Sequence, residues 1–148
     1  MRQLVAIAVT GGLVIWGVAW LVPRIGVPDR FWLSPLETVS VGGRELYVVR
    51  VGYAVGLRQV PSLGGLDGAL FVLDRAASPD HGMGMGGILM PLDVAFFDAD
   101  GYFIERFTMP VCRAEDCPTY TPSQPWQFAI EAPAGALGWI LHGAVLVR

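Results

Sequence analysis

Hydrophobic and polar positions alternate along most of this chain in short runs, a pattern typical of β-strands. The clearest example is segment 92–107, LDVAFFDADGYFIERF, in which two apolar runs flank the sequence Asp98-Ala99-Asp100-Gly101. Aspartate caps the backbone of such a turn and glycine supplies positive φ, so the segment predicts a β-hairpin. Segment 38–51 has the same form around Gly42-Gly43 and predicts a second hairpin.

Three further strands are predicted at 68–73, 126–132 and 143–148. Alternation places Trp126, Phe128 and Ile130 on one face of the strand 126–132. Helical signals are few.

Segment 52–63 predicts a short helix that ends before Pro61, and segment 133–141 predicts one helical turn. Many short strands with little helix predict a mainly β fold with a minor α contribution, in a compact, barrel-like domain.

The run from Leu4 to Val22 differs from the rest because it is apolar throughout and carries no charge. At 1.5 Å per residue, a helix of this length spans about one hydrocarbon core. A cleaved signal peptide is the alternative, but its apolar region is usually shorter. Trp16 and Trp20 suit a membrane interface. We therefore expect one N-terminal transmembrane helix, which divides the 148 residues into an anchor (1–23), a linker (24–37) and a β domain (38–148).

The two cysteines indicate where the β domain lies. Cys112 and Cys117 are close in sequence, so a short loop brings them within reach of a disulfide bond. A zinc site is the alternative, but it needs four ligands and the chain has no second cysteine pair. Disulfides persist in oxidising compartments, so we expect a single-pass protein of the bacterial inner membrane with its C-terminal domain in the periplasm.

Charge excludes one class of partner. The net charge is −3, and the ten basic residues are all arginines scattered without a run. Because nothing resembles a basic surface that could neutralise phosphates, we expect no nucleic acid partner.

The segment HGMGMGGILMPLD, residues 81–93, contains a formal match to the dinucleotide fingerprint G-x-G-x-x-G at Gly82, Gly84 and Gly87. That fingerprint works only between a strand and a helix, because the pyrophosphate rests on the helix N-terminus. Pro91 would break a helix that began at Gly87, and residues 74–81 are expected to form a loop. We therefore predict no nucleotide cofactor.

Metal binding is an alternative for the same segment. His81, Met83 and Met85 would share one face of an extended chain, and imidazole with thioethers suits Cu(I). Methionines that fill a core are the simpler explanation, so no metal site is predicted. Asp98 and Asp100 resemble part of a calcium loop, but the hairpin turn already accounts for them.

The sequence lacks the combinations of residues that nucleophilic catalysis requires. No serine lies in a nucleophile elbow, both cysteines are expected to be paired, and His81 and His142 are far apart in sequence. Asp93 begins a predicted strand, where a buried carboxylate could be functional, but it has no identifiable partner. We predict no catalytic residue and no enzyme.

The ordered motifs of residues 38–147 resemble the domain-of-unknown-function family 192, whose members are small, mainly β domains that are often exported or membrane-anchored. The positions that match are Gly56-Leu57, Leu70-Phe71-Val72, Met85, Pro91-Leu92-Asp93, Phe97, Asp98, Asp100-Gly101, Cys117-Pro118, Tyr120, Glu131 and Ala134-Gly135.

The departures lie where a ligand site would be expected. The family's W-M-K-N-T stretch reads Gly84, Met85, Gly86, Gly87 and Ile88 in this chain, so only the methionine persists. The resemblance implies that a polar ligand site at this place has been lost.

These observations favour a non-catalytic accessory subunit that packs on the extracytoplasmic face of an inner-membrane complex, such as a photosynthetic or respiratory one. Its partners would be the lipid bilayer and integral membrane subunits. The interface candidates are Gly11, Gly12, Phe31, Trp32, Gly84, Gly86 and Gly87. The alternatives are a periplasmic ligand-binding or enzymatic domain centred on Asp93, or a copper-binding protein.

Overall fold

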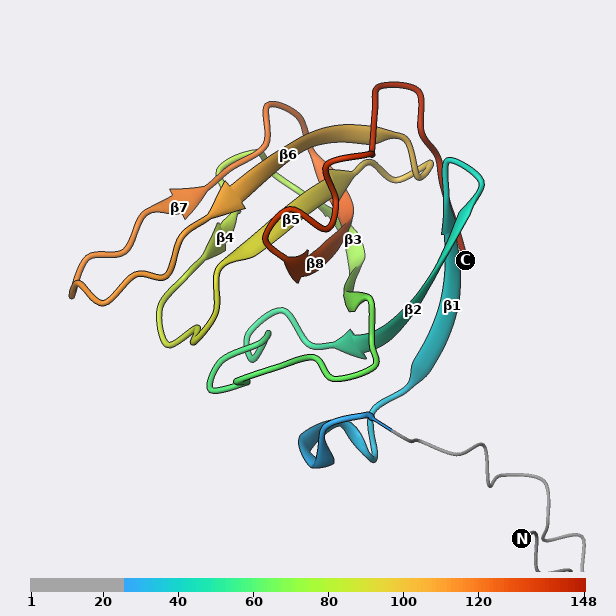
Figure 1. Ribbon diagram of the computed structural model, residues 1–148. Helices are drawn as coiled ribbons and strands as arrows, with labels where there is room; N and C mark the ends of the chain where they lie inside the picture. The colour runs from blue at the N-terminus through green and yellow to red at the C-terminus, as the bar shows by residue number, and fades with distance from the viewer. Residues whose placement is uncertain (1–25) are drawn as a thin grey trace, which may run out of the picture.

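The computed structural model describes residues 26–148, and these form a mainly β domain with almost no helix. Seven strands make one sheet in the order β6-β5-β8-β3-β2-β1-β9, which curls into a half-barrel (Figure 1). The strands of this sheet are β1 (Leu36–Val41), β2 (Arg44–Val51), β3 (Gly68–Ala77), β5 (Leu92–Phe97), β6 (Phe103–Met109), β8 (Trp126–Pro133) and β9 (Leu146–Val147). A separate two-stranded sheet joins β4 (Met83–Gly84) to β7 (Thr119–Tyr120).

The two predicted hairpins are confirmed. β1 pairs antiparallel with β2 across Gly42-Gly43, and β5 pairs antiparallel with β6 across the aspartate turn. In that turn the Asp98 carboxylate accepts hydrogen bonds from the backbone N–H groups of Asp100 and Tyr102, at 3.0 and 2.8 Å. The turn, rather than a metal, therefore accounts for Asp98.

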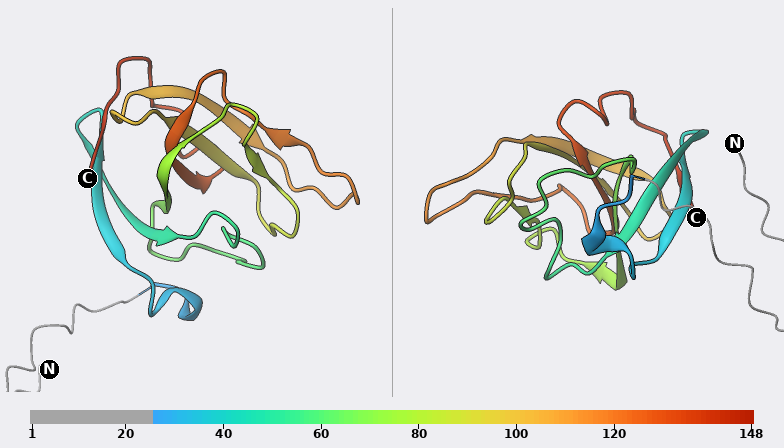
Figure 2. Two further views of the ribbon diagram at one scale, coloured as in Figure 1. Left: turned by 180° about the vertical axis from the view of Figure 1, so that it is seen from behind. Right: turned by 60° about the horizontal axis from the view of Figure 1, so that its bottom comes forward.

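The connection between β2 and β3 contradicts the predicted helix at 52–63. These strands are parallel, so the chain must cross back between them, and it does so through residues 52–67 in successive turns (Figure 2). Gly56 and Gln59 both have positive φ, +51° and +59°, which interrupts a right-handed helix. Apolar side chains hold the segment onto the sheet instead: Leu57, Val60, Leu63 and Leu66 are all buried.

The helical turn predicted at 133–141 is also wrong. The Ala136 N–H bonds to the Pro133 carbonyl and the Ile140 N–H to the Leu137 carbonyl, which makes two separate tight turns. Leu137 and Ile140 are buried, so the segment closes one end of the core.

Side chains on the two faces of the sheet form two hydrophobic cores. The first core includes Phe71, Leu92, Val94, Phe96 and Ala129, covered by residues from 52–67 and 82–90. The second core includes Val39, Leu70, Phe97, Ile130 and Leu137.

Trp126 lies in the first core, whereas Phe128 and Ile130 contact the second. The expectation of one shared face is therefore wrong. The change of face coincides with the point at which the pairing of β3 with β8 loses its regular register, between Val72 and Ala77.

The segment before β1 packs more closely than an irregular linker would. It contains a 3₁₀ helix, η1 (Asp29–Phe31), and Val27 and Phe31 are buried in the first core. β1 begins at Leu36, two residues earlier than predicted. The predicted anchor at 1–23, with Gly11 and Gly12, lies outside the described residues. From residue 26 onward, the structure has no helix long and apolar enough to span a membrane.

The C-terminal segment joins the two ends of the sheet. β9 pairs with β1, while the Leu146 N–H donates to the Gly101 carbonyl at 2.8 Å and the Phe103 N–H donates to the Ala144 carbonyl at 2.9 Å. Gly101 has φ +87°, and a Cβ atom there would lie 2.5 Å from the Leu146 carbonyl oxygen. The turn between β5 and β6 therefore requires glycine for this approach.

We predict that Gly101→Ala lowers the free energy of unfolding by about 1–3 kcal/mol, because it adds a steric clash to left-handed strain. Gly43→Ala is the matched control, since Gly43 has φ +86° but no atom within 4 Å of a Cβ. Urea denaturation of both variants measures the difference. Equal losses at the two positions would show that the contact with Leu146 contributes nothing.

Candidate functional site: a buried glutamate below a glycine-walled pocket

Glu131 is an acidic residue in the middle of the seven-stranded sheet. It lies on β8, opposite Val94 of β5 on one side and Ala69 of β3 on the other. Only 3% of its surface is exposed, and its Oε2 atom has no hydrogen-bond partner. Both strand neighbours are apolar, so the sheet itself offers the carboxyl nothing to bond.

Burial raises the pKa of Glu131 from its ordinary 4.5 to about 7, because water is excluded and the charged form loses its solvation. At neutral pH the carboxyl is therefore close to half ionised. Perturbed groups of this kind concentrate at functional sites, where their cost to stability serves binding or chemistry.

The side chain lines a pocket of about 230 Å³, here called the Glu131 pocket. Two segments form its walls, residues 53–58 and residues 82–88, and Phe71 of β3 also lines it. The polar side chains of the lining are those of Tyr53, Arg58 and Glu131.

Hydrogen bonds hold the two walls together at both ends. The Tyr53 hydroxyl donates to the Gly82 carbonyl at 2.6 Å. At the other end, both the backbone N–H and the side-chain Nε2 of Gln59 donate to the Gly87 carbonyl, at 2.9 and 3.2 Å. Burial raises the pKa of Tyr53, so its hydroxyl stays protonated as a donor at neutral pH.

The glycine segment therefore forms a wall of the pocket. Gly82 has to be glycine, because a Cβ atom would lie 2.1 Å from the Tyr120 carbonyl oxygen. Gly84 and Gly86 are exposed, with no atom within 4 Å of a Cβ, so they present bare backbone. β4 occupies part of the segment and no helix follows Gly87, in agreement with the argument against a dinucleotide fingerprint.

The copper set is not brought together on one accessible face. Met83 and Met85 are buried in the first core, whereas His81 is exposed. The His81 carbonyl accepts a hydrogen bond from the Trp126 indole N–H at 2.6 Å, which ties this segment to the core. Within residues 26–148, no group of three or more His, Cys, Asp or Glu side chains could hold a metal ion.

Asp93 is buried but has a full set of partners. Its Oδ1 accepts a hydrogen bond from the Thr108 hydroxyl at 2.7 Å. Its Oδ2 accepts bonds from the backbone N–H groups of Gly135 at 2.9 Å and Leu137 at 3.0 Å. These bonds fasten the turns after β8 to β5, so the geometry favours a structural role over a catalytic one.

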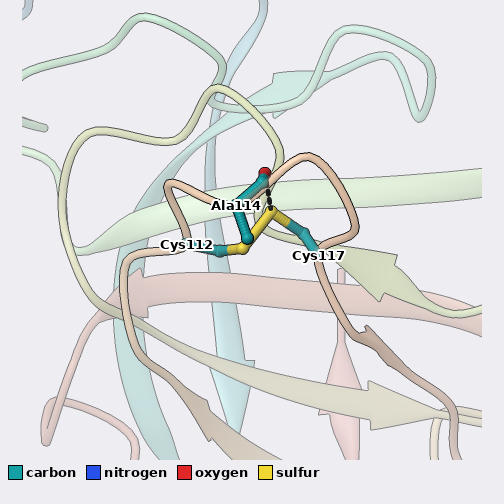
Figure 3. The surroundings of a disulfide bond; sticks show 3 residues. All are labelled: Cys112, Ala114 and Cys117. Atoms are coloured by element: carbon teal, nitrogen blue, oxygen red, sulfur yellow. Dashed lines mark hydrogen bonds between the residues drawn. A yellow bond between two sulfur atoms is a disulfide. The ribbon is translucent and has the colours of Figure 1, made fainter.

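The predicted disulfide is confirmed between Cys112 and Cys117 (Figure 3). Cys117 Sγ also lies 3.4 Å from the Ala114 carbonyl oxygen across the short loop. Cys112 forms an isolated bridge with Gly86, so the disulfide loop lies beside the glycine wall.

The two aromatic interface candidates differ in exposure, and Trp32 is the more exposed of them. Its surface is 57% exposed, and that of the adjacent Leu33 is 99% exposed. Phe31 is 2% exposed and packs in the first core.

The sequence analysis did not predict Glu131 as a site residue, although Glu131 matches the family pattern. Its signal was an acidic residue inside the apolar strand FAIEA. That pattern indicates a buried carboxyl, but it does not tell whether a partner satisfies it.

The fold and site define a small, curled β domain with a carboxyl-containing pocket. The family DUF192, described as an uncharacterized ACR, matches residues 50–140. Because this match spans more than half of the chain, the protein belongs to that family, as the motifs predicted. No curated protein matches the chain.

Two solved structures share the fold. A protein of Sinorhizobium meliloti, provisionally described as a transcription regulator, has a TM-score of 0.64 at 22% identity, covering 76% of this chain and 93% of that one. A protein of unknown function from Novosphingobium aromaticivorans has a TM-score of 0.62 at 19% identity, covering 76% and 85%. At these identities the likeness concerns the fold alone.

We predict that Glu131 makes stability fall as pH rises. A raised folded pKa means that the protonated carboxyl is favoured in the folded state, so its contribution is complete below about pH 4.5 and is lost through about pH 7. Relative to the Glu131→Gln variant, the free energy of unfolding of the parent protein should fall by about 3 kcal/mol between pH 4 and pH 9. Denaturation curves across this range measure the difference, and a constant offset would contradict the assignment.

We predict that the Asp93 carboxylate stabilises the folded state, in contrast to the ionised carboxylate of Glu131. Asp93→Ala leaves the Gly135 and Leu137 N–H groups and the Thr108 hydroxyl without their acceptor, and should cost about 3–5 kcal/mol. Thr108→Val removes a single partner and should cost less. Chemical denaturation compares the variants, and a loss below that of Thr108→Val would rule out the proposed role.

Proposed function

We propose that this protein is a non-catalytic binding domain, and that the Glu131 pocket receives a cationic group, such as a primary ammonium or guanidinium. The buried, unpartnered Oε2 atom carries the proposal. A cation would supply the missing hydrogen bond and charge, and so remove the cost of the ionised carboxyl.

The other lining residues support binding rather than chemistry. Tyr53 already donates its hydroxyl hydrogen to Gly82, and Arg58 is exposed, so solvent screens its charge. Glu131 is shielded from water and therefore has the stronger electrostatic effect on a group inside the pocket. The lining provides no nucleophile beside a base, which acyl or phosphoryl transfer would require.

A second function, that of an accessory subunit in an inner-membrane complex, is favoured by Trp32 and Leu33. Two large apolar side chains stand exposed directly before β1, near the N-terminal apolar segment in the sequence. We propose this arrangement for the periplasmic side of the membrane. Its test is native mass analysis in mild detergent: the tagged chain should co-migrate with a larger complex, and Trp32→Ser with Leu33→Ser should release it.

For the pocket, we predict that butylammonium binds the full chain in mild detergent and that neutral 1-butanol does not. Affinity should rise about tenfold from pH 6 to pH 8, because the ionised fraction of a carboxyl with a pKa near 7 rises by that factor. Isothermal titration calorimetry measures both ligands.

Glu131→Gln should abolish the binding and its pH dependence. Glu45→Gln is the matched control, because Glu45 is exposed and the substitution changes net charge equally. Amine binding that survives in the Glu131 variant, or that is absent from the parent protein, would refute the proposed site.

A further inference from the structure

β3 continues beyond the strand beside it. Its parallel pairing with β2 ends where Val51 lies opposite Phe71, yet β3 runs on to Ala77. On the β8 side, regular pairing ends at Val72 opposite Phe128 and returns only at Ala77 opposite Trp126. Within the described chain, the β2-side edge of β3 after Phe71 has no neighbouring strand.

The direction of one carbonyl group identifies the open backbone positions. The Gln127 side-chain amide donates to the Leu73 carbonyl at 3.0 Å, so the Leu73 backbone faces β8. Successive backbone groups of a strand alternate in direction, so those of Asp74 and Ala76 face the open side. Asp74 and Ala76 are themselves exposed.

A hollow of about 390 Å³ follows this part of β3. The consecutive residues 73–78 line it, together with Tyr53, His81 and Trp126. Tyr53 lines both this hollow and the Glu131 pocket, so the two hollows adjoin at this residue. Leu73 and Ala77 pack against the first core, on the sheet face to which Phe71 contributes.

We propose that the ligand of this protein is an extended peptide that pairs with the open edge of β3 and directs a lysine or arginine side chain into the Glu131 pocket. This inference rests on the proposed function. An open edge is a template for a further strand, in which backbone hydrogen bonds supply affinity and side-chain pockets supply specificity. The buried carboxyl selects a basic side chain by charge.

The alternation of side chains along a paired peptide supports separate roles for the peptide backbone and its basic side chain. Peptide side chains on the same face as Leu73 and Ala77 lie on the Glu131 side of the sheet, while the intervening side chains point to the opposite face. A basic residue flanked by β-branched residues therefore suits the site. The basic side chain can enter the Glu131 pocket, and its β-branched neighbours favour the extended conformation that strand pairing needs.

The probes are a blocked pentapeptide, Thr-Val-Lys-Val-Thr, and its counterpart with norleucine in place of lysine. Fluorescence anisotropy of labelled peptides with the full chain in mild detergent measures their affinities. We expect the lysine peptide to bind about tenfold more tightly, which corresponds to one charge-assisted hydrogen bond. Glu131→Gln should abolish this preference.

Ala76→Pro tests the strand pairing. It removes the N–H group on the open edge, where proline is sterically tolerated, and should weaken both peptides about fivefold. Ala76→Val keeps that N–H group and changes only the side chain, so the loss caused by Ala76→Pro beyond that of Ala76→Val measures the strand pairing. Butylammonium affinity should be unaffected by either variant, and far-ultraviolet circular dichroism checks that both fold.

The outcomes separate the two proposals. If butylammonium binds but Ala76→Pro leaves peptide affinity unchanged, strand addition is wrong and the proposed function stands. If the proline variant weakens peptides but lysine gives no advantage, the assignment of the basic side chain to Glu131 is wrong. If neither the amine nor the peptides bind, the proposed function fails as well.

Discussion

The central constraint in this domain is that it buries two carboxyl groups on neighbouring strands, each of which needs hydrogen-bond partners. Asp93 pairs with Ala132, and Val94 pairs with Glu131, so the two acids occupy successive rungs of the β5–β8 ladder. Strand alternation turns them to opposite faces of the sheet. Asp93 meets two backbone N–H groups and a hydroxyl, whereas Glu131 Oε2 has no partner. The first arrangement stabilises the fold, whereas the second leaves a buried polar atom without a hydrogen bond, as the proposed cation site requires.

Local sequence predicted those parts of the fold that local chemistry determines. The Gly42-Gly43 and Asp98–Gly101 turns and the disulfide all follow from residues close together in the chain. The crossover 52–67 did not follow, because its conformation depends on positive φ at Gln59 and on leucines that dock on a distant sheet. The continuation of β3 through Ala77 was missed for a similar reason, since its residues are exposed and carry no apolar alternation.

The candidate site could likewise be predicted only in part from the sequence. A carboxyl inside the run FAIEA was visible in the sequence, but its lack of a partner is a property of three strands and two loops together. The family resemblance implies a lost ligand site at the glycine segment, and that remains a prediction. In the structure, the carbonyl groups of Gly82 and Gly87 accept hydrogen bonds that hold the crossover against the segment, which forms a wall of the pocket.

The proposed binding of a cation would be linked to the release of a proton. Burial keeps the pKa of Glu131 near 7, so a cation that requires the ionised carboxyl must displace a proton over the pH range just below neutrality. The same ligand removes the desolvation cost that ionisation imposes on the folded domain. The proposed binding would therefore stabilise the domain most at the pH where Glu131 costs the folded state most. A satisfied carboxyl such as Asp93 cannot act in this way, because the fold already provides all of its partners.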